Sequence, residues 1–278
     1  MGHLTPSFFI VGERKCGTSS LYRYLLAHPQ VLPCKVKEPQ FFTQHLLKIW
    51  WNQKKYFQLF PDPNRLDEIT MDWPELDEKG QLFEEQVRFS TKEQQEYITG
   101  EASANALYLA NPKVVKRYLP KVKIIMMFRH PVDRAFSHYR MIQRFQGEGR
   151  KTRMLMGFEV DMMKEMQEAR IGKKTDFIGP GIYINQLKKW EKVFGKDQIF
   201  VIRMEDLAKP KKSLKVMNEL TSFLNLQAFD YREVLQKRFN VAPATDFPLH
   251  MREEMLFYYR PSNLVLEDHL QRKLNWNE

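Results

Sequence analysis

A short apolar run followed by a loop between two glycines is the feature that most constrains the fold of this chain. The run is FFIVG, from Phe8 to Gly12, and the loop that follows it ends at Gly17. From Thr18 to Ala27 the apolar residues recur at the three- and four-residue spacing of a helix. This order predicts a buried strand, a tight loop and a helix that begins beside the loop.

Later segments repeat this order of strand and helix. The apolar run 123–129 precedes Pro131, a residue favoured in the first turn of a helix, and helical spacing continues through Arg144. The run 198–203 precedes a helical stretch, residues 211–224. Short strands that alternate with helices predict an α/β fold, a parallel sheet flanked by helices on both faces.

Two segments depart from this alternation within what we expect to be a single domain, residues 1–278. Residues 50–96 contain Pro61, Pro63 and Pro74 and show little periodicity, which indicates an insertion packed over the sheet. Residues 147–179 contain a methionine-rich stretch with helical spacing. Methionine commonly fills gaps in a core, so a core-facing helix is one interpretation and a mobile cover over the substrate is the other.

Composition restricts the class of protein. No stretch reaches the roughly 18 consecutive apolar residues of a membrane-spanning helix, and no basic and apolar leader opens the sequence. The two cysteines, Cys16 and Cys34, indicate reduced thiols rather than a disulfide in a chain of this size. We therefore expect a cytoplasmic protein without a membrane partner. The net charge of +10 favours an anionic partner of some kind.

The loop GERKCGTSS, residues 12–20, predicts an anion site. A loop that joins a strand to a helix turns backbone N–H groups toward a bound phosphate, and the positive end of the helix dipole adds to the attraction. The Walker A pattern has its lysine directly after the second glycine, whereas here Thr18 follows Gly17 and Lys15 precedes it by two residues. This displaced lysine argues against an ATPase or kinase. A purely structural glycine turn is the alternative.

A second motif, RHPVDRAFS at residues 129–137, predicts another phosphate contact. Arg129 ends the second predicted strand, and parallel sheets bind their ligands at the carboxyl ends of the strands. A guanidinium at this place suits a phosphate, and Ser137 lies two helical turns further on, where its hydroxyl can donate beside it. The alternative is an arginine paired with Asp133 and a solvated serine.

Taken together, these motifs resemble those of the sulfotransferases that use 3′-phosphoadenosine-5′-phosphosulfate (PAPS). The similarity is greatest to the heparan sulfate sulfotransferases and their bacterial relatives, which include sulfotransferase domains of polyketide synthases. It extends over residues 7–276 and implies the family's P-loop-like nucleotide-binding fold. Further matching motifs follow in the family's order: KEPQFF (37–42), GEAS (100–103) and GIYINQLKKWEKVFG (181–195).

The resemblance also implies which residues bind the cofactor. The first loop would hold the 5′-phosphosulfate, Arg129 and Ser137 would hold the 3′-phosphate, and QKRFN (236–240) would form part of a basic cap. The family works without a metal, so we expect none, and the product would be 3′-phosphoadenosine-5′-phosphate (PAP). The implied cofactor-binding residues are Arg14, Lys15, Cys16, Gly17, Thr18, Ser19, Arg129, Ser137, Tyr183, Lys237, Arg238 and Asn240.

Two residues are expected to carry the chemistry. Negative charge builds on the leaving oxygen during sulfuryl transfer, so the cation of Lys15 is the candidate that stabilises the transition state. The resemblance assigns the general base, which takes the proton of the acceptor hydroxyl, to Glu38 of KEPQFF. His250 is the alternative base, since imidazoles accept protons near neutral pH.

The acceptor is open at this stage. We expect a hydroxyl on an acyl chain bound to an acidic carrier protein of a bacterial polyketide pathway, and the alternative is a hydroxyl of a glycan or a small molecule. A nucleotide kinase and a nucleic-acid-binding module are the rivals from other classes. The displaced lysine disfavours the first, and the lack of a nucleic-acid-binding motif disfavours the second, so we expect no nucleic-acid partner.

Overall fold

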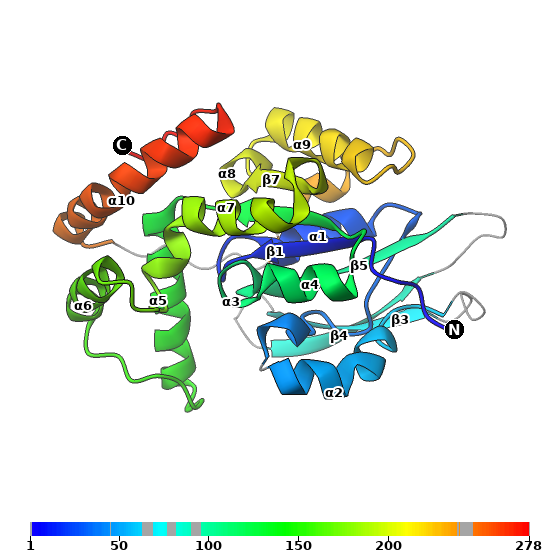
Figure 1. Ribbon diagram of the computed structural model, residues 1–278, viewed down its shortest axis with the longest axis horizontal. Coiled ribbons are helices and arrows are strands. Elements are labelled where there is room, and N and C mark those ends of the chain that lie inside the picture. Colours follow the sequence, from blue (N-terminus) through cyan, green and yellow to red (C-terminus); the bar gives the residue numbers. More distant parts are fainter. Residues whose placement is uncertain are drawn as a thin grey trace.

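The apolar run near the N-terminus forms the central strand of a five-stranded parallel sheet (Figure 1). The strands lie in the order β2-β5-β1-β6-β7, and every neighbouring pair is parallel. Their bounds are Phe8–Gly12 for β1, Val31–Leu32 for β2, Ile98–Ala104 for β5, Lys123–Phe128 for β6 and Ile199–Arg203 for β7. The side chains of β1 are buried throughout, as in a sheet covered on both faces. The predicted α/β fold is confirmed.

The computed structural model describes residues 2–44, 46–62, 69–76, 82–89, 96–237, 239 and 247–277. Its α-helices are α1 (Thr18–Leu26), α2 (Leu46–Phe57), α3 (Ala106–Leu109), α4 (Pro112–Tyr118), α5 (Pro131–Gly147), α6 (Phe158–Arg170), α7 (Tyr183–Phe194), α8 (Met204–Leu207), α9 (Pro210–Phe223) and α10 (Leu249–Leu270). Over these described ranges, no helix is both long enough and apolar enough to span a membrane.

The topology separates the helices into two layers. The chain leaves β1 through α1 and crosses to β2 on one side, whereas it leaves β5 through α3 and α4 and crosses to β6 on the other (Figure 1). Because parallel crossovers are right-handed, α1 and α4 cover opposite faces of the sheet. Helix α7 packs beside α4. In register, Gly12 lies opposite both Ala104 and Met127, so the carboxyl ends of three strands meet at one edge.

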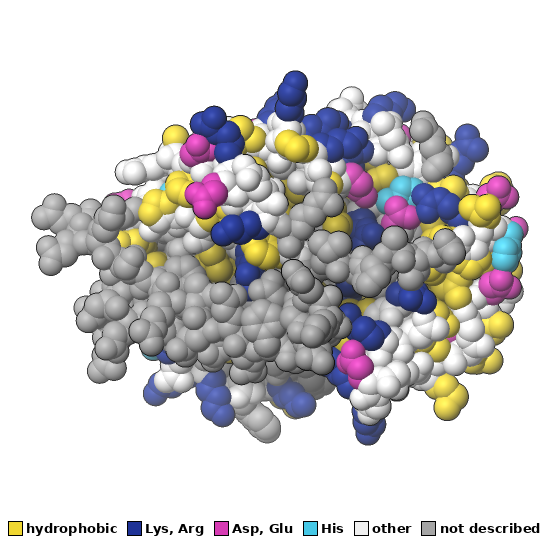
Figure 2. Space-filling view, turned by 180° about the vertical axis from the view of Figure 1, so that it is seen from behind, with side chains coloured by type: hydrophobic (Ala, Val, Ile, Leu, Met, Phe, Trp, Pro, Cys, Tyr) yellow, Lys and Arg dark blue, Asp and Glu magenta, His cyan; other side chains and the backbone are white. Residues whose placement is uncertain are grey.

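A second apolar cluster lies beyond this edge, where α5, α6 and α10 meet. It includes Val132 and Tyr139 from α5 and Met255 and Tyr259 from α10. The methionine-rich segment divides between core and surface: Met162 and Met166 of α6 are buried in this cluster, while Met154, Met156 and Met163 are exposed. Figure 2 shows hydrophobic side chains gathered at this end of the molecule, with Lys and Arg spread over the described surface elsewhere on that face.

The segment 50–96 contains regular structure that its sequence pattern did not indicate. It includes most of α2 and an antiparallel hairpin of β3 (Ile69–Leu76) and β4 (Leu82–Phe89). Helix α2 is joined to the core through Ile49 and Tyr56, which are both buried.

Candidate active site

The loop after β1 forms an anion cradle at the edge where the strands end. Lys15 and Gly17 both have positive φ, 72° and 85°, and the Cys16 N–H donates to the Glu13 carbonyl at 3.1 Å. Helix α1 then makes its first bond from the Leu21 N–H to the Gly17 carbonyl at 3.1 Å. By helix geometry, the N–H groups of the preceding residues have no intrahelical acceptor and point out of the helix end.

Close contact between strand and helix fixes this cradle. A Cβ at Gly12 would lie 2.5 Å from the Cγ2 of Thr18, so only glycine fits at the end of β1. At Gly17 the left-handed backbone conformation itself favours glycine. Gly12 therefore allows α1 to pack close against β1, and Gly17 allows the turn between the loop and α1.

Lys15 is held among other cations in this loop. Its pKa is lowered from 10.5 to about 8, by burial first and then by the charges of Arg129, Arg144 and Lys37, in that order of effect. A half-buried ammonium with positive neighbours is unfavourable until an anion joins it. The three cations come from different segments of the chain, so the fold gathers positive charge at this point.

Arg129, which the sequence predicted as a second phosphate contact, lies directly beside Lys15. It follows β6, and its Nη1 donates to the Lys15 carbonyl oxygen at 3.0 Å. The Tyr183 hydroxyl donates to the Arg129 carbonyl at 2.9 Å from the start of α7. Ser137 lies on α5 six residues after Pro131, and its side chain is half-buried. The loop and the end of β6 thus form one basic site.

Cys16 and Tyr183 lie beneath the site rather than on its surface. Both side chains are buried, at 0% and 1% exposed, and the Cys16 Sγ lies 3.5 Å from the Tyr183 hydroxyl. Tyr183 also stacks on Phe128 with ring centroids 4.5 Å apart. These side chains support Arg129 and the loop from below. Both cysteines of the chain are free and buried, as expected.

Arg14 is exposed, and its guanidinium is oriented by α5 and by the residue after β5. Its Nη1 donates to the Nε2 of His138 at 3.4 Å. With the Asn105 amide turned so that both groups are satisfied, its oxygen accepts from Arg14 Nε at 2.9 Å and from Nη2 at 3.1 Å. Arg14 therefore approaches the site from the side of β5.

Glu38 lies on a loop that is tied to the end of β5. The Gln40 Nε2 donates to the Glu38 Oε2 at 3.0 Å and to the Ala104 carbonyl at 2.8 Å. The neighbouring residue Lys37 is close enough for its charge to act on Lys15. The structure thus brings the KEPQFF motif to the phosphate loop. That Glu38 is the base stays a prediction.

His250 lies elsewhere. It is on the first turn of α10, and its exposed ring pairs with Glu159 of α6, Nε2 to Oε1 at 2.8 Å. The contacts of His250 join two peripheral helices, and it has no contact in the structure with the loop residues.

The predicted basic cap is described in part. The Lys237 carbonyl accepts from the Tyr24 hydroxyl at 3.0 Å, and the Phe239 carbonyl accepts from the Ser20 hydroxyl at 3.3 Å. The Arg23 guanidinium lies over the Phe239 ring at 4.8 Å. The segment therefore crosses α1 near the cradle. Arg238 and Asn240 lie outside the described residues.

Two buried carboxylates near the site were not predicted from the sequence. Burial raises the pKa of Glu13 to about 8, and its Oε1 accepts from the Tyr108 N–H at 2.7 Å. Burial also raises the pKa of Glu101 to about 7. Glu13 belongs to GERKCGTSS and Glu101 to GEAS, so their places in the two motifs could have indicated a role at the site. Their burial could not be predicted, because it depends on tertiary contacts.

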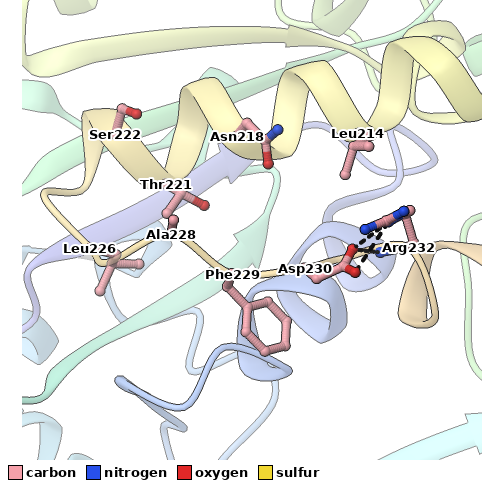
Figure 3. Close-up of a pocket in the computed structure, with 9 residues that line it drawn as sticks. All are labelled: Leu214, Asn218, Thr221, Ser222, Leu226, Ala228, Phe229, Asp230 and Arg232. Atoms are coloured by element: carbon pink, nitrogen blue, oxygen red, sulfur yellow. Dashed lines mark hydrogen bonds and ion pairs between the residues drawn. The ribbon is translucent and has the colours of Figure 1, made fainter.

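A separate hollow of about 550 Å³ lies between α9 and the segment that follows it (Figure 3). Its lining includes Phe229 and the ion pair of Asp230 with Arg232, whose Nε lies 2.9 Å from Oδ1. The end of α9 lies at the opposite edge of the sheet from the cradle, because the Phe223 carbonyl contacts the ammonium of Lys123, the first residue of β6. This hollow is therefore distinct from the basic site.

Among the described residues, no three or more His, Cys, Asp or Glu side chains are grouped as they would be around a metal ion. The expectation that the reaction needs no metal stays a prediction.

Known proteins with similar sequences transfer sulfuryl groups. The chain is 27% identical over 252 residues to human carbohydrate sulfotransferase 15, covering 80% of this chain and 44% of that protein. It is 28% identical over 240 residues to the human bifunctional heparan sulfate N-deacetylase/N-sulfotransferase 3, covering 83% of this chain and 23% of that protein. The chain thus spans less than half the length of these relatives.

A solved structure matches almost the whole chain. The sulfotransferase from Alicyclobacillus acidocaldarius superposes with a TM-score of 0.68 at 26% identity, covering 99% of both chains. The profile of the sulfotransferase family matches residues 6–230, which include the cradle, Glu38, Arg129 and Tyr183. The resemblance inferred from the motifs is confirmed, and this chain belongs to the sulfotransferase family.

Proposed function

We propose that this protein transfers a sulfuryl group from PAPS to a hydroxyl of an acceptor. The observation that supports this most is the joining of Lys15 and Arg129 by a 3.0 Å hydrogen bond beside the N-terminal N–H groups of α1. A helix end with two cations suits a ligand that carries phosphate at two positions. The donor set therefore fits the 5′-phosphosulfate and the 3′-phosphate of PAPS.

Each residue of the site has a separate role in this proposal. The N–H groups of Thr18 and Ser19 and the Lys15 ammonium hold the 5′ end, while Arg129 and Ser137 hold the 3′-phosphate. When bound, PAPS supplies an activated sulfuryl group. The acceptor oxygen forms the new S–O bond as the bond to the 5′-phosphate oxygen breaks, and Glu38 takes the hydroxyl proton. Lys15 stabilises the negative charge that develops on the leaving oxygen.

Calorimetry with PAP and with ATP tests the nucleotide assignment. We expect PAP to bind at least about tenfold more tightly, because Arg129 gains a charge-assisted contact with the 3′-phosphate. Equal affinity for the two nucleotides, or a preference for ATP with Mg²⁺, would favour the kinase alternative. Tight binding of an oligonucleotide without a preference for PAP would favour a nucleic-acid-binding module.

The variant Glu38→Gln tests the assignment of the base. Glutamine keeps the size of the side chain and can still interact with Gln40, but it cannot take the proton. We expect kcat to fall on the order of 10²- to 10⁴-fold while the Kd for PAP stays unchanged. His250→Gln is the matched control and should keep wild-type activity. Loss of activity in the His250 variant alone would transfer the role to His250.

A carbohydrate hydroxyl is the acceptor class that we favour. Two relatives at 27% and 28% identity are named for carbohydrate and heparan sulfate substrates, and the chain's net charge of +10 suits a polyanionic sugar. The second is named for transfer to nitrogen, so these names support the sugar, and the choice of a hydroxyl rests on our assignment of the base. A hydroxyacyl chain on an acidic carrier protein is the other candidate, supported by the same net charge. Transfer of labelled sulfate from PAPS to a desulfated glycosaminoglycan, compared with transfer to a carrier-bound 3-hydroxyacyl chain, separates these classes.

A further inference from the structure

We propose that Glu101 is a positioning residue for the general base, acting on the Glu38 loop through Ser103 and Gln40. The inference rests on the proposed function, because it assigns to Glu38 the removal of the acceptor proton. Glu101 and Ser103 alternate with Ala102 on β5, so their side chains lie on the same face of the sheet. Both are buried, at 0% and 1% exposed.

The carboxylate of Glu101 is bonded by two hydroxyl groups, one on each oxygen. The Tyr56 hydroxyl donates to Oε1 at 2.6 Å, and the Ser103 hydroxyl donates to Oε2 at 2.6 Å. In its ionised form, which prevails above its pKa of about 7, Glu101 only accepts hydrogen bonds, so each hydroxyl directs its single proton to it. The oxygen of Ser103 is then left as an acceptor with a fixed direction.

That acceptor holds the backbone of the Glu38 loop. The Gln40 N–H donates to the Ser103 Oγ at 3.0 Å, and the Gln40 side chain donates to the Ala104 carbonyl at 2.8 Å. Gln40 has a φ of 51°, a left-handed conformation that residues other than glycine rarely adopt, so these contacts hold it in place. The same side chain donates to Glu38 at 3.0 Å.

The surroundings keep this chain of hydrogen bonds rigid. Tyr56 stacks on Phe41 with ring centroids 4.3 Å apart, and Phe42 lies 5.8 Å from Phe9 of β1. The two phenylalanines follow Gln40 in KEPQFF and anchor that side of the loop in the core. Pro39 restricts Glu38, the residue before it, to an extended backbone. A base placed this way reaches the same position at each turnover, which is what proton transfer requires.

Ser103→Ala tests the proposal, with Thr99→Val as the matched control. Thr99 lies on the same strand and face, is fully buried, and donates its hydroxyl to the Leu32 carbonyl at 3.0 Å. We expect Ser103→Ala to lower kcat about 10- to 100-fold without changing the Kd for PAP. Thr99→Val should keep kcat within about twofold even though it also loses a buried hydrogen bond.

Combination with Glu38→Gln separates positioning from general damage. If Ser103 acts through Glu38, adding Ser103→Ala to Glu38→Gln changes kcat by less than about twofold, because the base is already lost. An equal loss in both backgrounds would overturn the proposal. Gln40→Gly supplies a variant that suits the left-handed backbone, and it should also lower kcat at unchanged Kd for PAP. If the wild-type protein transfers sulfate and either Ser103→Ala or Gln40→Gly keeps the wild-type kcat, the positioning role is refuted and the proposed function is not. If the wild-type protein transfers no sulfate, the proposed function itself is refuted.

Discussion

Lys15 carries the positive charge on which the site depends, although its surroundings in the fold destabilise the protonated form. Its pKa is lowered to about 8 by burial first and by Arg129, Arg144 and Lys37 after it. The protonated form is therefore destabilised in the free protein. An anion at the cradle removes this cost, so the residue responds more to a bound sulfonate or phosphate than an exposed lysine would.

Lys15→Arg and Lys15→Ala together test the role of this charge. In the wild type we expect kcat/KM for PAPS to fall as the pH rises through about 8, because the free protein loses the ammonium there. Lys15→Arg should lack this alkaline loss, since a guanidinium stays charged. Lys15→Ala should lower kcat far more than it weakens binding of PAP. An unchanged kcat in Lys15→Ala at saturating PAPS would refute the role.

Arg129→Ala should remove discrimination by the 3′-phosphate. The guanidinium is fixed beside Lys15 at 3.0 Å, so its loss costs the phosphate a positioned charge-assisted contact. We expect the ratio of the PAP and AMP dissociation constants to approach one in calorimetry. Arg140→Ala is the control, because Arg140 is exposed on α5 and bonded only to Gln143 among its described contacts. A preserved preference for PAP in Arg129→Ala would make Arg129 structural.

At the scale of elements, the strands that the sequence predicted are those with apolar runs. β1, β6 and β7 were predicted within two residues of their observed bounds. β5 was not predicted as a strand, because Thr99, Glu101 and Ser103 are polar although they are buried. Besides the bond between Ser103 and Glu101, their hydroxyl and carboxyl groups have partners distant in sequence, namely Leu32, Gln40 and Tyr56, and local periodicity contains no information about such partners.

The same limit explains which parts of the candidate site could be predicted. Lys15 and Arg129 belong to motifs at the carboxyl ends of strands, and in a parallel sheet these ends share one edge, so the sequence pattern alone predicts that the two residues meet. Glu13 and Glu101 lie in motifs as well, but an acid in a sequence is expected to be solvated. Only the fold reveals that Glu101 faces Tyr56 from a helix 45 residues away.

One arginine holds the segment that leads into α6. Arg153 pairs with Glu165 at 2.6 Å, with Asp176 at 3.0 Å and with Asp161 at 3.4 Å. Glu165 in turn accepts the N–H groups of Phe177 and Ile178, at 2.7 and 3.0 Å. The two ends of the segment 153–178 are therefore joined through one buried carboxylate.

We expect Arg153→Ala to destabilise the protein by about 3 kcal/mol, because it leaves the buried carboxylates of Asp161 and Glu165 without their cation. Arg150→Ala is the control: its pair with Glu148 is exposed at 3.8 Å, and we expect a loss of about 1 kcal/mol or less. Urea unfolding measures both. Equal losses for the two variants would show that the network does not anchor the segment.

At the scale of the whole molecule, buried titratable groups set how stability depends on pH. Burial raises the pKa of Glu13 from 4.5 to about 8 and that of Glu101 to about 7. Such an acid binds more protons in the folded than in the unfolded state. The free energy of unfolding therefore falls as the pH rises from the pKa of the unfolded state to the pKa of the folded state. Burial lowers the pKa of His28, His130 and His138 below 6.5. These histidines make stability rise with pH, and they do so only below pH 6.5.

Between pH 6.5 and 8 the two acids therefore dominate, and the lowered pKa of Lys15, about 8, opposes them only at the upper end of this range. There we expect the free energy of unfolding to fall by about 2 kcal/mol, most of it from Glu13, whose pKa is the higher.

Glu13→Gln should remove most of this dependence, since an amide imitates the protonated acid and can still accept the Tyr108 N–H. Glu219→Gln is the control, because Glu219 is exposed and pairs with Lys215 at 3.8 Å. Urea unfolding at both pH values measures the three proteins. If stability decreases as much in Glu13→Gln as in the wild type, Glu13 is ionised in the folded protein throughout this range. Its buried charge would then have to be balanced by Arg134, the nearby cation whose charge lowers the pKa of Glu13.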